Sequence, residues 1–151
     1  MKHFSAMMAR SLAALLLGVV LTACSTTDKR ALEASNAKLV DIHTQLATGH
    51  FMRNQSEFAL QEANKALAIN PDDSQANNIM ALIQARLRND DKAEKYYRKS
   101  IDGDGDNSEA RNNFAVFLCE HGRVQEAVRH FDAALANPLY KNITGRFVQS
   151  H

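Results

Sequence analysis

The chain has 151 residues, of which 45% are hydrophobic and 23% are charged, and its formal net charge is +1. This composition is ordinary for a globular protein and is sufficient for one domain with a modest core. It lacks the concentrated basic character of nucleic-acid-binding proteins. We therefore expect no nucleic-acid partner.

Residues 1–23 have the composition of a targeting segment. Lys2 and Arg10 form a basic start, and residues 11–21 are an apolar run that ends shortly before Cys24. A run of 11 residues is too short to span a bilayer but suits a signal peptide. We predict a signal peptide that is cleaved after Ala23. An ordinary secretory signal with a chance cysteine is the alternative.

The tetrapeptide Leu21-Thr22-Ala23-Cys24 resembles the lipobox of bacterial lipoproteins. The resemblance implies that the Cys24 thiol takes a diacylglyceryl group and that the amine freed by cleavage is acylated, since a thiolate is nucleophilic enough to form the thioether. Several acyl chains give stable membrane anchoring. Ser25 stands where an Asp favours inner-membrane retention in enterobacteria, which implies a lipid anchor on the periplasmic face of the outer membrane. Residues 24–36 are mostly polar, and we predict that they are a lipidated tether.

A period of 34 residues relates three later parts of the chain. Two of its columns hold small residues, Ala47, Ala81 and Ala115, and Ala59, Ala93 and Ala127. Two hold mostly bulky residues, Leu46, Met80 and Phe114, and Ala63, Tyr97 and Phe131. The pattern resembles tetratricopeptide repeats, in which each unit is a pair of antiparallel helices. The small residues allow close approach of the helices and the bulky residues fill the space between them. We therefore predict an all-α solenoid of about three helix pairs.

Turn-forming residues mark the borders of these units. They occur between units at 70–74, 102–108 and 137–138, and within units at 53–56, 88–90 and 121–123. We predict repeats at about 40–73, 74–107 and 108–141, inside a domain that covers 37–141. Residues 142–151 have no helical period, and we expect an irregular tail.

The acidic turn Asp102-Gly-Asp104-Gly-Asp106 is similar to a calcium-binding loop. An EF-hand requires Gly at its sixth position and Glu at its twelfth, where this chain has Asn107 and Asn113. We therefore interpret the segment as a solvated turn between repeats. The six histidines form no zinc-binding pattern, and His130 is expected on the outward side of a helix. We predict no metal site.

The sequence contains no catalytic motif. It has no phosphate-binding glycine loop, no nucleophile elbow and no paired-carboxylate signature. Cys119 has no predicted base beside it, so we expect it to be a small apolar residue in the helix packing. We predict that the protein is not an enzyme and that it has no cofactor other than the covalent lipid on Cys24.

The first helix of each repeat lines the concave surface in this class of solenoid. By repeat position, that surface comprises Asp41, Thr44, Thr48, Phe51, Met52, Gln75, Asn78, Leu82, Arg86, Glu109, Asn112, Val116 and Glu120. It combines amides for backbone hydrogen bonds with apolar contacts, and it lacks the Lys/Arg cluster that holds a C-terminal carboxylate. We predict a protein partner rather than a small-molecule substrate.

The third repeat is the most specific part of the sequence. Residues 112–123 read Asn-Asn-Phe-Ala-Val-Phe-Leu-Cys-Glu-His-Gly-Arg, Glu126-Ala127 follows, and the repeat ends in Ala136-Asn137-Pro138-Leu139-Tyr140. This resembles the type IV pilus biogenesis and stability lipoproteins of the PilW/PilF type, over residues 20–140. The resemblance implies a pilotin, which binds the pilus secretin, brings it to the outer membrane and promotes its multimerisation, and thereby supports twitching motility.

Members of that family usually continue with further repeats. This chain departs from the pattern after Tyr140, and we expect a C-terminally short member. Another periplasmic scaffold lipoprotein, serving cell-wall enzymes or outer-membrane assembly, is the alternative function, since it would share the anchor and the repeats.

Overall fold

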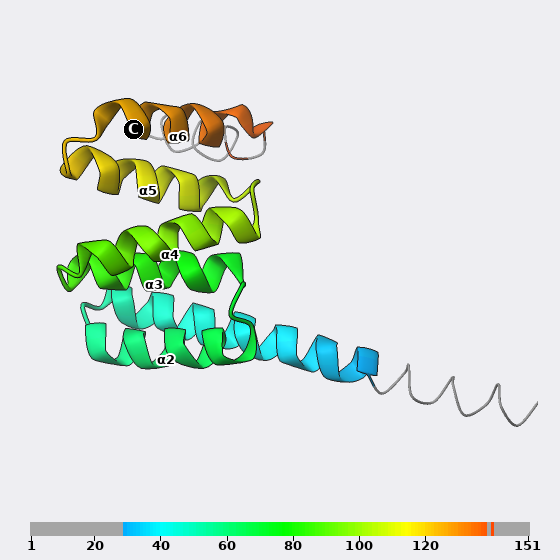
Figure 1. Cartoon of the computed structure of the whole chain (residues 1–151). Helices are drawn as coiled ribbons and strands as arrows, with labels where there is room; N and C mark the ends of the chain where they lie inside the picture. The colour runs from blue at the N-terminus through cyan, green and yellow to red at the C-terminus, as the bar shows by residue number, and fades with distance from the viewer. Residues whose placement is uncertain (1–28, 139, 141–151) are drawn as a thin grey trace, which may run out of the picture. The chain divides into compact units, whose positions relative to one another are not determined.

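The computed structural model describes residues 29–138 and 140. Residues 29–52 are helical, and the helices that follow are α2 (Ser56–Ile69), α3 (Ser74–Arg86), α4 (Asp90–Gly103), α5 (Ser108–Glu120) and α6 (Val124–Ala136). The described residues contain no strand. From residue 39 onward, successive helices run in opposite directions and stack in chain order (Figure 1). The prediction of an all-α solenoid of three helix pairs is confirmed.

The chain divides into two units, residues 1–38 and 39–151. In the first unit, residues 29–38 are helical and solvent-exposed, and Lys29 Nζ lies 3.8 Å from Glu33 Oε1 one turn later. Ala31, Leu32 and Ala34 are strong helix formers, so the predicted tether has helical structure here that its polar composition did not indicate. The signal peptide 1–23, Cys24 and the tail 142–151 lie outside the described residues.

The same turn closes each helix pair. A residue with positive φ stands at Asn54 (60°), Arg88 (61°) and Gly122 (74°), at intervals of one repeat. The amide that follows it donates to the carbonyl five residues earlier, which is the bonding pattern of a Schellman motif. These bonds run from Gln55 to His50, from Asn89 to Gln84 and from Arg123 to Leu118, each at 2.9 Å.

The turns between repeats are held by side-chain caps at equivalent positions. Asp73 Oδ1 accepts from the Ala76 amide at 2.8 Å, and Asn107 Oδ1 accepts from the Ala110 amide at 2.9 Å. Such caps satisfy amides that have no partner within the helix. Asp104 Oδ1 accepts from the Asp106 amide at 2.9 Å, so a carboxylate of the acidic segment shapes the turn itself.

The core lies between the helices at the columns of small residues. The alanines at these columns, Ala47, Ala59, Ala81, Ala93, Ala115 and Ala127, are all fully buried. Bulky rings fill the adjacent space, and the Tyr97 and Phe114 rings stack with their centroids 5.3 Å apart. Small residues therefore bring the helices together, and aromatic residues join one repeat to the next.

Leu46 departs from its column. It is 46% exposed, whereas Met80 is 1% exposed and Phe114 is fully buried. Phe114 packs on Tyr97, which lies on the second helix of the preceding repeat. No such second helix precedes Leu46 among the described residues. The expectation that Leu46 fills the space between helices is therefore wrong.

Candidate functional site

The first helices of the three repeats together line a pocket of about 220 Å³. Its lining residues are Thr44, Thr48, Phe51, Met52, Gln75, Asn78, Ile79, Leu82, Glu109 and Asn113. Within each helix they recur at intervals of three and four residues, which places them on one face. Eight of these ten residues belong to the groove predicted from the sequence.

The other predicted groove residues lie on the same helices but outside this pocket. Asp41, Arg86, Val116 and Glu120 are exposed, and Asn112 is half-buried.

Arg86 is already engaged within the protein. Its guanidinium carbon lies 3.4 Å from the centroid of the Phe51 ring, and its Nη1 donates to the Phe51 carbonyl. A cation above an aromatic face is a favourable contact. Arg86 thus joins the end of the first helix to α3 and fixes the orientation of a pocket-lining ring.

The floor of the pocket differs from the sequence-based expectation. Asn78 is only 2% exposed, and its Oδ1 accepts from Asn113 Nδ2 at 3.2 Å, so its carbonyl oxygen is used inside the protein. Ile79 and Asn113 also line the pocket, although sequence reasoning did not include them. They occupy the repeat position directly after the predicted column 44, 78 and 112, and that adjacency is the signal that could have identified them. Thr44 Oγ1 is buried and has no hydrogen-bond partner among the described residues.

Two other residues lie where the sequence reasoning did not expect them. Cys119 is exposed, because Phe114, Phe117 and Leu118 take the buried positions of α5, so the prediction that it packs between helices is wrong. His130 is half-buried, with its ring 4.8 Å from the Phe114 ring, and is not on the outward side of its helix. Burial lowers the pKa of His130.

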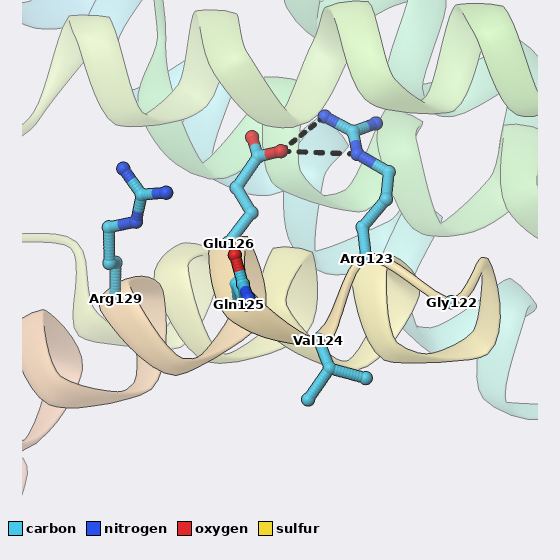
Figure 2. A pocket seen from close by; sticks show the side chains of 6 residues that line it. All are labelled: Gly122, Arg123, Val124, Gln125, Glu126 and Arg129. Carbon is cyan, nitrogen blue, oxygen red and sulfur yellow. Dashed lines mark hydrogen bonds and ion pairs between the residues drawn. The ribbon is translucent and has the colours of Figure 1, made fainter.

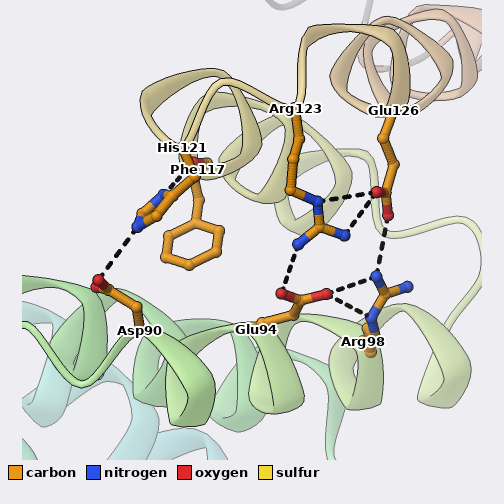
Figure 3. A network of polar contacts seen from close by, with 7 residues as sticks. All are labelled: Asp90, Glu94, Arg98, Phe117, His121, Arg123 and Glu126. Carbon is orange, nitrogen blue, oxygen red and sulfur yellow. Dashed lines mark hydrogen bonds and ion pairs between the residues drawn. The ribbon is translucent and has the colours of Figure 1, made fainter.

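A charged network joins the second helices of repeats two and three (Figure 3). Arg123 Nη1 lies 2.6 Å from Glu94 Oε2, and Arg123 Nη2 lies 2.6 Å from Glu126 Oε2. Arg98 Nη2 lies 2.6 Å from Glu94 Oε1 and 2.9 Å from Glu126 Oε1. Hydrogen bonds from Arg123, and to a smaller extent those from Arg98, lower the pKa of both carboxyl groups. The four charges neutralise one another, which indicates a structural role in joining the repeats.

His121 lies next to this network. Its Nδ1 is 2.7 Å from the Phe117 carbonyl oxygen, and its Nε2 is 3.2 Å from Asp90 Oδ2 on α4. The hydrogen bond to the Phe117 carbonyl raises the pKa of His121 most, and the hydrogen bond to Asp90 raises it further. His121 therefore provides a second, pH-dependent link between the two repeats.

A wider hollow of about 510 Å³ lies beside the start of α6 (Figure 2). Gly122, Arg123, Val124, Gln125, Glu126 and Arg129 line it. Arg123 and Glu126 are paired, and Val124 points away from them. A single helix start supplies all of these residues, so the hollow has no opposing wall from another repeat, and we assign it no binding role.

Among the described residues, no His, Cys, Asp and Glu side chains gather in a group of three that could hold a metal ion. None of the helices in the described part of the chain is long and apolar enough to cross a membrane.

Residues 96–129 match the family model described as tetratricopeptide repeat. The type IV pilus assembly protein PilF of Pseudomonas aeruginosa is 31% identical over 137 residues, which cover 89% of this chain and 54% of that protein. A solved structure of P. aeruginosa PilF has 29% identity and a TM-score of 0.68, over 70% of this chain and 48% of that one. This chain has the tetratricopeptide-repeat fold and is similar to PilF.

A crystal structure of PilW, described as a widely conserved type IV pilus biogenesis factor, supports the same relationship. It has 32% identity and a TM-score of 0.63, over 67% of this chain and 46% of that one. The chain therefore spans about half the length of the PilF and PilW chains that it matches. The second tetratricopeptide-repeat domain of RPAP3, solved with an HSP90 peptide, has a TM-score of 0.61 at 19% identity, which shows the shared fold alone.

Proposed function

We propose that this chain is an outer-membrane lipoprotein adaptor of type IV pilus biogenesis. In this role it is a pilotin, which binds the pilus secretin and promotes its outer-membrane localisation and multimerisation. The observation that carries the proposal is the 31% identity to PilF over 137 residues, which extends over 89% of this chain. The similarity to PilW, another type IV pilus biogenesis factor, supports the same process.

The proposed mechanism separates anchoring from binding. Acyl chains on Cys24 hold the chain at the periplasmic face of the outer membrane, because two or more chains give stable anchoring. The pocket on the first helices then holds a segment of the secretin. Phe51, Met52 and Leu82 provide apolar contacts there, and Gln75 and Asn113 provide amides.

The groove suits a polypeptide better than a reacting substrate. Its side chains are hydroxyls, amides and apolar groups with one carboxylate, so it can hydrogen-bond a backbone and bury side chains. An adaptor of this kind requires no catalytic group, and we propose a non-enzymatic role.

The groove is tested by filling it. Thr48 is exposed and lines the pocket, so Thr48→Trp places a bulky ring in the pocket without disturbing the buried core. Gln45→Trp is the matched control, because Gln45 is exposed on the same helix outside the pocket. Both variants should fractionate with the outer membrane. Only Thr48→Trp should lose heat-stable secretin multimers and twitching.

The anchor is tested separately by Cys24→Ala. The expected product is a soluble or inner-membrane precursor, and the secretin multimers should be lost. An unchanged outer-membrane fraction would contradict the anchor. Normal secretin multimers and normal twitching in a strain that lacks the protein would contradict the pilotin role and favour another scaffold function.

A further inference from the structure

The charge of the groove is one-sided. Among the residues that the structure describes, Glu109 is the only charged residue that lines the pocket. Among the other predicted groove residues, Asp41 and Glu120 are acidic and Arg86 is basic. All three lie on the same three helices as the pocket residues.

The Arg86 cation does not neutralise the Glu109 carboxylate. Arg86 is stacked on Phe51 and donates to its carbonyl, so it is committed to the wall of the groove. Glu109 is exposed and forms no ion pair with any Lys or Arg of the described chain. The carboxylates of the second-helix network, by contrast, are each paired with two arginines. Within the described part of the chain, the groove therefore contains a carboxylate without a cationic partner, beside apolar side chains.

We propose that the segment held in this groove carries apolar side chains next to a Lys or Arg whose cation pairs with Glu109. This inference rests on the proposed function, because it assumes that the groove holds a polypeptide. The apolar side chains of the segment pack on Phe51, Met52 and Leu82. Electrostatic complementarity of this kind selects partners and orients them more than it adds affinity.

The position of Glu109 also has a structural effect. It is the second residue of α5, where a carboxylate stabilises the positive end of the helix dipole. Glu57 is the second residue of α2, is also exposed, and does not line the pocket. Glu57→Gln is therefore the matched control for Glu109→Gln, because both remove a first-turn carboxylate and only one removes it from the groove.

The test measures peptide binding to the full lipoprotein in detergent micelles. Two fluorescein-labelled peptides share the same Leu and Phe positions and differ only in having Lys or Glu at the remaining charged positions. Fluorescence anisotropy gives the dissociation constant for each peptide. Circular dichroism melting establishes that each variant is folded.

The wild-type protein should bind the Lys peptide more tightly than the Glu peptide. Glu109→Gln should weaken binding of the Lys peptide about two- to fivefold, the range for one exposed charge pair, and Glu109→Lys should reverse the preference. Raising the salt concentration should reduce the difference between the peptides. Glu57→Gln should bind both peptides like the wild type.

Equal binding of the two peptides by the wild type would overturn the inference, as would equal weakening by Glu57→Gln and Glu109→Gln. The proposed function is judged by other variants. If Thr48→Trp abolishes secretin multimers and Glu109→Lys leaves them normal, the charge inference fails and the proposed function stands. If Thr48→Trp leaves the multimers normal, the proposed use of the groove fails.

Discussion

Gly103 is the position where one added methyl group should have the clearest effect on stability. It ends α4, close to the turn that precedes α3. A Cβ atom built on Gly103 would lie 2.6 Å from the Asp72 carbonyl oxygen and 3.8 Å from the Ser74 amide nitrogen. Carbon and oxygen do not approach this closely, and the obstacle is backbone, so the turn would have to move.

The surrounding hydrogen bonds oppose such a movement. Ser74 Oγ donates to the Ser100 carbonyl at 2.8 Å, and Ser100 Oγ donates to the Ser74 carbonyl at 2.7 Å. Overpacking costs roughly 1–3 kcal/mol, and replacing Gly with Ala in a helix gains at most about 1 kcal/mol. With that gain subtracted, Gly103→Ala should lower the free energy of unfolding by up to about 2 kcal/mol.

Gly49→Ala is the matched comparison, because the nearest atom to its added Cβ would be Arg53 Nη1 at an ordinary 3.8 Å. Without a clash, the helix propensity of Ala should raise the free energy of unfolding by about 0.5–1 kcal/mol. Urea unfolding followed by far-UV circular dichroism measures both changes. If both variants are more stable than the wild type, the close approach at Gly103 is wrong.

Three further changes test the packing, the turns and the link between repeats. Phe114→Ala removes a fully buried ring that stacks on Tyr97, and it should cost about 3–5 kcal/mol in urea unfolding; a loss below about 1 kcal/mol would contradict the packing. Arg88→Gly relieves a positive φ of 61° and should stabilise the protein by about 0.5–1 kcal/mol, and an unchanged urea midpoint would argue against strain there. The pKa of His121 is raised in the folded protein, so its contribution to stability is complete below the unfolded pKa of about 6.5 and is lost as the pH rises through the folded value. Asp90→Asn should lower the pKa of His121 in an NMR titration and flatten that pH dependence, whereas an unchanged titration would mean that Asp90 makes no contribution.

The sequence predicts the fold because repetition averages out local ambiguity. Ala81 alone indicates little, but a small residue at the same place in three successive repeats indicates close packing of helices. The same averaging misleads at the end of the array. Leu46 shares its column with Met80 and Phe114, yet burial at that column depends on a preceding second helix, which is a property of the neighbour and not of the residue.

The groove is predictable in outline and not in detail. Repeat position places Thr44, Leu82 and Glu109 on the first helices, and the structure brings them to one pocket. The pairing of Asn78 with Asn113 depends on the distance between α3 and α5, which no local pattern encodes. The prediction for Cys119 failed because Phe117 and Leu118 take the buried positions beside it on α5, which leaves the Cys119 side chain exposed.

The charged network consists of contacts that a single sequence does not reveal, because their spacing differs from the repeat. Glu94 and Arg98 are four residues apart on α4, a spacing typical of helical ion pairs. The contacts between repeats, Arg123 with Glu94 and Arg98 with Glu126, are separated by 29 and 28 residues, so a period of 34 does not reveal them. They follow from how the second helices pack.

Burial separates the residues that build the solenoid from those that face a partner. The alanine columns are fully buried and carry the close helix contacts, so substitutions there change stability first. Thr48 and Glu109 are exposed on the first helices, and the core does not depend on them. Substitutions at these two positions should therefore change partner binding while leaving the fold intact, which is why they separate binding from folding in the experiments above.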